Sequence, residues 1–375
     1  MKVLMTGGGT GGHVYPAIAI ADTIRSKIPD VEIAFVGTPR GIENRICKAE
    51  KYPIYHVNVM GIRRSLSFAN IKALYLAKVS PIKARKIISE FKPDIVIGTG
   101  GYVCWPITVA AAREGIPTLL HESNVFPGLA VRKLQDKVDR ILLNFAESKK
   151  HLKNEAAERA LCVGNPLRGG FGSISRGEAR KAIGVSDATQ KIILSYGGSR
   201  GAQRMNEAIF EFMKEFAPKN PNVLHIHSTG DIGAEEFRDR FAAAGLDKLP
   251  NIKLYDYIED MPTKMAAADL VICRAGAMTV SEISMMKKAA IFIPSPNVAE
   301  NHQYKNAKLL ADKNAALVIE EKELTAERLY GEIDSLLKDD ERRSTMSDNV
   351  GAFSNPNANK LIFDEVMRLV NLKMK

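Results

Sequence analysis

Short apolar runs alternate along this chain with longer segments whose apolar positions recur at helical spacing. The run 2–6 passes through a glycine-rich stretch into the segment 17–24, where the apolar positions have the period of a helix. Further runs predict strands at 32–37, 93–98, 116–120, 141–143 and 160–163, and later at 191–196, 223–226, 252–255, 270–273, 290–293 and 316–319. Alternating strands and helices are typical of parallel sheets in α/β domains.

The combination of strand, glycine loop and helix occurs twice. Gly7, Gly8, Gly9, Gly11 and Gly12 follow the first run, and the segment 197–202 follows the run 191–196 and precedes a helical pattern over 205–216. The repetition predicts an α/β fold of two Rossmann-like domains with mainly parallel sheets facing a central cleft, where open α/β sheets bind ligands.

The length and the breaks in the pattern place the domains. With 375 residues and 45% hydrophobic composition, the chain is long for one core and natural for two. The segment 164–170 interrupts the alternation and is the expected linker. We therefore expect domains at 1–164 and 165–356, with a last helix in 357–375 that packs back on the first domain.

The first glycine loop indicates an anion-binding site. Glycines let an oxygen-rich ligand approach the backbone, and the amino end of the following helix favours negative charge. A tight turn is the alternative, although one glycine would suffice for that. Gly7, Gly9 and Gly12 also match the dinucleotide pattern, so an NADP-dependent oxidoreductase must be weighed, with Arg40 as partner for the extra phosphate. The acidic residue that would bind the ribose after the second strand is missing there.

Polar and small residues follow other predicted strands. The segment 99–102 is a second glycine turn, and the segment 121–124 is a polar cluster that helix capping would explain only in part. In the second domain, the segment 274–282 leads from a strand into a helix whose amino end offers donors to a diphosphate. Glu282 could accept hydrogen bonds from two ribose hydroxyls, or be an ordinary glutamate of a surface helix.

The net charge of +10 makes an anionic partner plausible. Between residues 60 and 92, eight basic residues and one acidic residue are mixed with apolar ones, which is typical of a helix on an anionic membrane surface or of a helix with a solvated cationic face. Nucleic acid is not expected, because no recognised binding motif accompanies the charge. The sequence shows no membrane-spanning run and no signal-peptide core, and its four scattered cysteines are expected to be reduced, in the cytoplasm.

Several of these segments together resemble the MurG family of bacterial N-acetylglucosaminyltransferases. The similarity spans nearly the whole chain, in the family's order and spacing, and is carried by the segments 8–13, 100–102, 121–124, 164–168, 197–202 and 274–282. The resemblance implies a GT-B fold and an inverting transfer of GlcNAc from UDP-GlcNAc to the MurNAc C4 hydroxyl of undecaprenyl-diphosphate-MurNAc-pentapeptide (lipid I), giving lipid II. It also implies a peripheral protein on the cytoplasmic face of the cell membrane.

The resemblance further implies residue roles. UDP-GlcNAc contacts are expected at Thr10, Gly11, Gly12, Asn124, Arg168, Ser199, Ile258, Ala277, Met278, Thr279, Val280, Ser281, Glu282 and Gln303. The acceptor diphosphate is expected at Gly9, His13, Gly100, Gly101 and Tyr102, and the membrane contact at Arg63, Arg64, Lys72, Leu74, Tyr75, Lys78, Val79 and Lys83. Arg200 and His302 depart from the family, which commonly has glutamine at both positions.

His13 and Glu122 are the candidates for the catalytic base. A histidine titrates near neutral pH, although a helix start would lower the basicity of His13 and suit it to acceptor binding or to capping instead. No cofactor and no essential divalent metal are expected, because the chain has no Asp-x-Asp pair to hold a metal against a diphosphate. The remaining alternatives are a GT-B transferase with another lipid acceptor and a peripheral membrane protein without enzymatic activity.

Overall fold

The computed structural model describes residues 1–61, 68–198 and 201–374. The chain forms two compact units, Met1–Arg168 with Asn355–Lys375, and Gly169–Ser354. The expected boundaries were 164/165 and 356/357. Each unit is an α/β domain built on a sheet of parallel strands, so the predicted fold class is confirmed.

The first unit contains a seven-stranded sheet in the order β3-β2-β1-β4-β5-β6-β7. Its strands are β1 (Lys2–Thr6), β2 (Glu32–Gly37), β3 (Ile54–His56), β4 (Ile95–Gly98), β5 (Thr118–Glu122), β6 (Arg140–Leu143) and β7 (Ala160–Cys162). Its helices are α1 (Gly11–Lys27), α2 (Glu43–Ala49), α3 (Phe68–Phe91), α4 (Cys104–Arg113), α5 (Leu129–Leu134), α6 (Asn154–Glu158) and α15 (Ala358–Met374).

The second unit contains a six-stranded sheet in the order β10-β9-β8-β11-β12-β13. Its strands are β8 (Lys191–Tyr196), β9 (Val223–Ser228), β10 (Ile252–Tyr255), β11 (Leu270–Cys273), β12 (Ala290–Phe292) and β13 (Leu317–Val318). Its helices are α7 (Arg176–Ala182), α8 (Gln203–Phe216), α9 (Ala234–Ala243), α10 (Met261–Ala267), α11 (Ala277–Met286), α12 (His302–Ala311), α13 (Ala326–Lys338) and α14 (Asp340–Gly351).

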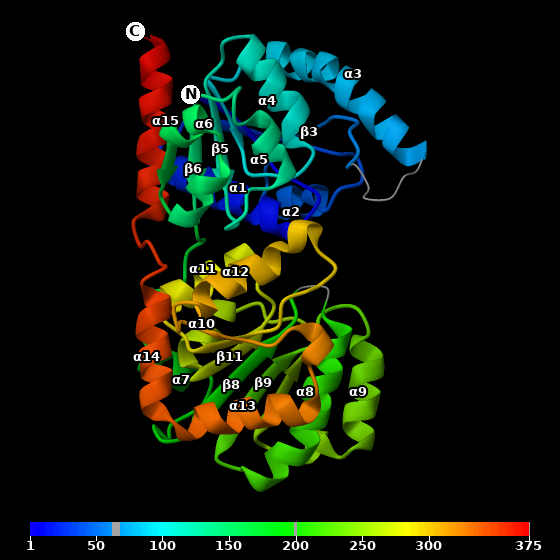
Figure 1. Ribbon diagram of the computed structural model, residues 1–375, viewed down its shortest axis with the longest axis vertical. Coiled ribbons are helices and arrows are strands. Elements are labelled where there is room, and N and C mark those ends of the chain that lie inside the picture. Colours follow the sequence, from blue (N-terminus) through cyan, green and yellow to red (C-terminus); the bar gives the residue numbers. More distant parts are fainter. Residues whose placement is uncertain (62–67, 199–200, 375) are drawn as a thin grey trace. The chain divides into compact units, whose positions relative to one another are not determined.

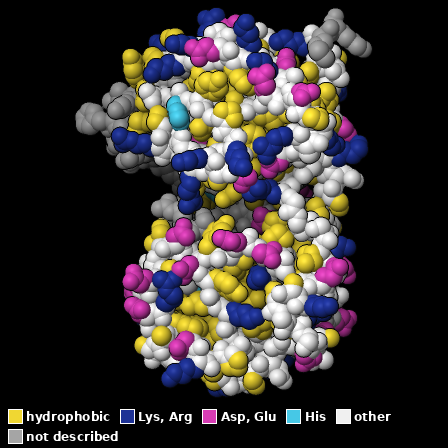
Figure 2. Space-filling model, turned by 180° about the vertical axis from the view of Figure 1, so that it is seen from behind, with side chains coloured by type: hydrophobic (Ala, Val, Ile, Leu, Met, Phe, Trp, Pro, Cys, Tyr) yellow, Lys and Arg dark blue, Asp and Glu magenta, His cyan; other side chains and the backbone are white. Residues whose placement is uncertain are grey.

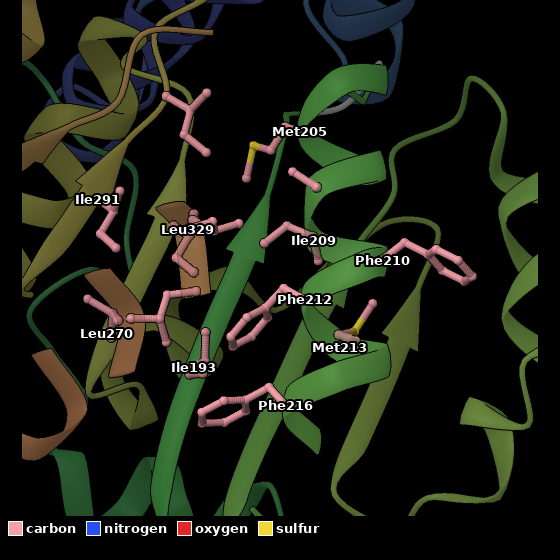
Figure 3. Close-up of a cluster of buried hydrophobic side chains, with 14 of the residues drawn as sticks. Ile193, Met205, Ile209, Phe210, Phe212, Met213, Phe216, Leu270, Ile291 and Leu329 are labelled. Atoms are coloured by element: carbon pink, nitrogen blue, oxygen red, sulfur yellow. The ribbon is translucent and has the colours of Figure 1, made fainter. Parts of the chain in front are cut away.

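Each sheet is covered by helices whose apolar faces are buried. In the second unit, Ile209, Phe212 and Phe216 of α8 point toward Ile193 of β8 (Figure 3), and all four are nearly inaccessible to solvent. In the first unit, α15 packs beside α1 (Figure 1), with Val366 and Ile18 in the same buried cluster. The sheets thus hold the loops at their carboxyl ends in fixed positions.

The edge strand β3 and the end of β5 are the differences from the sequence prediction that concern the sheet of the first unit most. The edge strand β3 was not predicted, since only three residues pair with β2. The strand predicted to end at residue 120 continues to Glu122, because His121 and Glu122 pair in register with Leu142 and Leu143 of β6. Both polar side chains are buried and find hydrogen-bond partners there, which reduces the penalty that polar residues would otherwise bring to a central strand.

Candidate functional site

Two glycine loops meet in the first unit. They follow the neighbouring strands β1 and β4, and the Gly8 amide donates to the Gly100 carbonyl at 3.4 Å. Gly101 has φ +82°, and a Cβ on it would lie 2.2 Å from the Gly8 oxygen. The close approach therefore requires glycine at position 101.

The His13 side chain is fixed against these loops. Its Nδ1 lies 3.1 Å from the Gly8 oxygen and 3.3 Å from Thr10 Oγ1, and a Cβ on Gly100 would lie 2.5 Å from its Cδ2. A carbonyl oxygen only accepts, so Nδ1 donates to Gly8 and the lone pair of the neutral ring lies on Nε2. The imidazole is thus held in the tautomer that a general base needs.

The residues expected to bind the acceptor diphosphate lie close together. The Tyr102 ring covers Gly9, where a Cβ would lie 3.2 Å from Cε1 of the ring, and Tyr102 is 37% exposed. The amides of Gly11 and Gly12, which are expected to contact UDP-GlcNAc, lie beside them at the start of α1 and have no backbone acceptor in the described parts of the chain, as is usual at a helix amino end. The arrangement can receive an anion beside His13.

The carboxylate oxygens of Glu122 are engaged by the protein, whereas a catalytic base would need an oxygen that is accessible to the substrate. Its Oε1 accepts from the amide and the side-chain nitrogen of Asn124, at 2.8 and 3.1 Å, and its Oε2 accepts from the Gly128 amide at 2.7 Å. Burial raises the pKa of Glu122. The carboxyl group orders the loop 123–128 and holds Asn124, so the geometry favours His13 as the base.

His121 and Arg168 are both engaged within the first unit. His121 Nε2 donates to the Gly164 carbonyl at 2.9 Å. Burial lowers the pKa of His121 to about 4, so the ring is neutral and holds the Gly164 carbonyl in place. The Arg168 guanidinium contacts Glu50 at 2.9 Å and lies 3.8 Å from Asp22. The role of Arg168 in binding UDP-GlcNAc stays a prediction.

The second unit carries the other glycine loop. Ser199 and Arg200 lie outside the described residues, and Gly201 has φ +79° with space for no side chain, since a Cβ would lie 2.3 Å from the Thr229 oxygen. Ile258 is buried, and Gln303 Oε1 accepts from the Ser295 amide at 2.9 Å. The last contact leaves the amide nitrogen of Gln303 to donate to a ligand.

Helix α11 begins in the turn that follows β11. It starts at Ala277 after Gly276, so the predicted contacts Ala277, Met278, Thr279, Val280 and Ser281 form its first turn. Arg274 is held away from this turn by the Ile293 carbonyl at 3.0 Å and by Glu321. The amino end of α11 can therefore face a diphosphate without a competing side-chain cap.

Glu282 directly follows these residues in α11. It is half-buried, and it has no hydrogen-bond or ion-pair partner among the described residues. Burial raises the pKa of this carboxyl group to about 7. A buried carboxyl group without a partner is costly for the protein, which is typical of a group kept for a ligand.

His302 stands where the family commonly has glutamine. Its Nδ1 donates to the Ala299 carbonyl at 2.8 Å, and burial lowers its pKa. The preceding residues Glu300 and Asn301 have φ of +55° and +50°, a left-handed conformation that costs free energy in residues other than glycine. Lys51, Lys92, Lys287 and Asn314 share this conformation, so it does not by itself mark a binding site, and the sugar contact expected at Gln303 stays a prediction.

The basic segment contains the long helix α3. Arg63 and Arg64 lie outside the described residues, and the side chains of Lys72 and Leu74 are not described. Tyr75 and Ile82 are 65% and 70% exposed, Lys78 and Lys83 are exposed, and Val79 is half-buried.

The first unit thus offers apolar side chains to solvent beside cationic ones. On the face seen in Figure 2, Lys and Arg side chains of this unit also stand among hydrophobic ones. Among the described helices, none combines the length and the apolar character that crossing a membrane requires.

Metal ligands do not cluster in the described ranges 1–61, 68–198 and 201–374. No group of three His, Cys, Asp or Glu side chains is placed there to hold an ion. The expectation that catalysis needs no divalent metal stays a prediction.

Sequence reasoning missed Glu43. The ribose carboxylate of a dinucleotide site was sought after β2, and Glu43 is the first acidic residue there. It is 1% exposed and bonds to the first glycine loop, with Gly9 donating to its Oε2 at 3.2 Å. Its carboxyl group is thus not open to a ribose. The two glycines that precede it, Gly37 and Gly41, were the available signal.

Comparisons with known proteins agree with this geometry. Residues 3–143 match the glycosyltransferase family 28 N-terminal domain, and residues 192–362 match the C-terminal domain of the same family. The UDP-N-acetylglucosamine–N-acetylmuramyl-(pentapeptide) pyrophosphoryl-undecaprenol N-acetylglucosamine transferase of Thermoanaerobacter sp. (strain X514) is 43% identical over 97% of this chain and 98% of its own. The transferase of the same name from Acetivibrio thermocellus is 41% identical over 100% and 99%.

Solved structures show the same fold. The crystal structure of Acinetobacter baumannii MurG has a TM-score of 0.76 and 28% identity, covering 98% of this chain and 99% of its own. A UDP-GlcNAc 2-epimerase from Neisseria meningitidis, bound to UDP-GlcNAc, has a TM-score of 0.67 at 16% identity over 98% and 100%, which is a likeness of fold alone.

Proposed function

Because this chain belongs to glycosyltransferase family 28 and to the MurG group within it, we propose that it transfers GlcNAc from UDP-GlcNAc to lipid I in peptidoglycan synthesis. The enzyme is a hexosyltransferase with a GT-B fold. The product of the transfer is lipid II.

The donor binds through the second unit. The observation that carries this assignment is Glu282, a half-buried carboxyl group with no hydrogen-bond or ion-pair partner among the described residues, in α11, whose amino end has no side-chain cap. The first turn of α11 binds the diphosphate, Glu282 accepts from both ribose hydroxyls, and the Ile258 backbone contacts the uracil. Ser199 assists at the diphosphate, and Gln303 contacts the sugar.

The acceptor is activated in the first unit. His13 Nε2 takes the proton of the MurNAc C4 hydroxyl as its oxygen bonds to the anomeric carbon of GlcNAc, and the bond from that carbon to UDP breaks on the opposite face. The configuration is therefore inverted. The Gly8 carbonyl accepts from Nδ1–H throughout, which stabilises the imidazolium that forms. The glycine loops with Tyr102 hold the acceptor diphosphate.

Helix dipoles and amides replace a metal at the leaving group. The amino end of α11 and Ser199 stabilise the departing UDP, so the reaction needs no essential divalent cation. This proposal is supported by the amino end of α11, which no side chain caps.

The enzyme acts as a peripheral protein on the cytoplasmic face of the cell membrane. Tyr75 and Ile82 of α3 enter the interface, and Lys78 and Lys83 pair with anionic headgroups. Support comes from the exposure of these four side chains on one helix.

Ligand titration separates this function from the alternatives. We expect UDP-GlcNAc to bind and NADPH not to bind, and UDP release to require a lipid I analogue. Binding of NADPH would favour an oxidoreductase, and binding of neither would favour a non-enzymatic membrane protein. UDP release with another lipid-linked sugar, but not with the lipid I analogue, would indicate a different acceptor.

A further inference from the structure

Glu43 is a buried carboxyl group beside the His13 loop. It is the first residue of α2 and is 1% exposed. Its Oε1 accepts from the Thr38 amide at 2.8 Å and from Thr38 Oγ1 at 2.9 Å, and its Oε2 accepts from the Gly9 amide at 3.2 Å. In the described parts of the chain it forms no ion pair. Burying a carboxyl group without a cation costs free energy, which calls for a reason.

Three glycines make room for this side chain. A Cβ on Gly8 would lie 2.8 Å from Glu43 Cδ, one on Gly37 would lie 2.6 Å from Cγ, and one on Gly41 would lie 2.0 Å from Oε1. The space that holds the Glu43 side chain lies between the turn after β1 and the turn after β2. The Glu43 carboxylate therefore has one position there, and its hydrogen bonds connect the two turns.

The Gly8–Gly9 peptide links Glu43 to His13. In a planar trans peptide the N–H and the C=O point in opposite directions. The Gly9 N–H points to Glu43 Oε2, and the Gly8 C=O lies 3.1 Å from His13 Nδ1. Gly101 packs against the same carbonyl, where a Cβ would lie 2.2 Å from the oxygen. The two side chains thus occupy opposite ends of one peptide dipole.

We propose that Glu43 is a positioning residue that orients His13 and strengthens its base function through the Gly8–Gly9 peptide. The inference rests on the proposed role of His13 as the base. A carboxylate that accepts from Gly9 polarises the peptide and makes the Gly8 oxygen a stronger acceptor. The stronger acceptor stabilises the Nδ1–H tautomer and the imidazolium, as a directly bonded carboxylate does in hydrolase triads.

The bond from Gly9 to Glu43 also limits which amides of this loop can meet a ligand. The Gly9 amide is used by Glu43, so the donors left at this end of α1 are those of Gly11 and Gly12. The competing view is that Glu43 only holds the turn after β2 in place. The two views differ in one respect, namely whether the loss of Glu43 acts through His13.

Glu43→Gln tests the proposal in a double-mutant cycle with His13→Ala. The glutamine amide would set its own donor against the N–H of Thr38 or Gly9. Loss of such an outer partner typically costs 10- to 100-fold, so kcat should fall by about this factor while the KM for UDP-GlcNAc is unchanged. The acid limb of the kcat/KM profile should move to lower pH. In the His13→Ala background, Glu43→Gln should have no further effect on kcat.

Two further variants keep the test interpretable. Glu32→Gln removes the same charge at the amino end of β2, where Glu32 pairs with Lys2 at the surface, and should leave kcat and the pH profile unchanged. If Glu43→Gln does not fold, Thr38→Val removes one of the three donors to the carboxylate and should give a smaller fall in kcat with the same direction of pH shift. Thermal unfolding checks that each variant is folded.

The outcomes are distinguishable. An equal fall in kcat in both backgrounds, or an unshifted acid limb in Glu43→Gln, would overturn the relay and leave His13 as the base. Full kcat in His13→Ala would overturn the base assignment and the relay together, whereas acceptor-dependent UDP release by the wild type would still support the transferase function.

Discussion

Replacing Glu282 by glutamine should weaken nucleotide binding and stabilise the ligand-free protein. Burial raises the pKa of Glu282 from 4.5 to about 7, so between these two pH values the folded protein binds a proton that the unfolded chain has lost. Stability therefore falls as the pH rises from 4.5 to 7, by about 3 kcal/mol in total. Glutamine is neutral and avoids this cost, so the variant should unfold several degrees higher than the wild type at pH 8.

The same change removes the ribose acceptor. A hydrogen bond to a charged group contributes about 1.5–3 kcal/mol, so UDP should bind about 10- to 100-fold more weakly, and KM should rise more than kcat falls. Wild-type affinity should also decrease below pH 7 as the carboxylate is protonated, and the variant should lack this dependence.

Calorimetric titration with UDP and thermal unfolding at pH 5 and pH 8 measure both effects. Glu211→Gln is the control, since this glutamate is exposed on α8 and pairs with Lys214 at the surface, so neither quantity should change. Wild-type UDP affinity in Glu282→Gln, or a lower unfolding temperature than the wild type at pH 8, would refute the reasoning.

Four other outcomes are expected. His13→Ala should lower kcat by about 10²- to 10⁴-fold with UDP-GlcNAc affinity intact, and a rise in acceptor KM alone would make His13 a binding residue. Reversing Lys78 and Lys83 to glutamate should weaken sedimentation with anionic vesicles, at about 1 kcal/mol for each lysine, while soluble acceptors still react; unchanged sedimentation would refute the membrane role. A chelator should not abolish turnover, and complete loss restored by magnesium would contradict the role of α11. Burial lowers the pKa of His227 to about 4, so stability should fall as the pH drops from 6.5 to 4, and His227→Phe should reduce this loss in acid unfolding; an unchanged pH dependence would exclude His227 as its source.

The sequence predicted the elements whose pattern is strong. The strands around Leu4 and Ile193 are continuous apolar runs that end in glycines, so both sheets and both glycine loops could be located. The three-residue strand β3 has no such run. The polar residues His121 and Glu122 lie inside a strand, but their sequence resembles that of a loop, because periodicity cannot show which hydrogen-bond partners the fold supplies.

The candidate site residues were proposed from residue type and from the resemblance, and their contacts follow only from the fold. His13 was identified from its glycine loop, whereas the tautomer that its bond to Gly8 imposes follows only from the fold. Glu43 contacts a loop 34 positions away in the sequence, and Glu122 has its oxygens engaged by its own loop. Spacing alone cannot distinguish a carboxyl group that orders a loop from one that is open to substrate.

The most direct test of the transferase account is the structure of its product. The enzyme is incubated with UDP-GlcNAc, labelled with ¹³C in the sugar, and a lipid I analogue, and the disaccharide is examined by NMR. The account predicts a GlcNAc bonded to the MurNAc C4 oxygen in the β configuration, inverted from the α configuration of the donor. A retained α configuration, or label released only as free GlcNAc or as an isomerised nucleotide sugar, would contradict it.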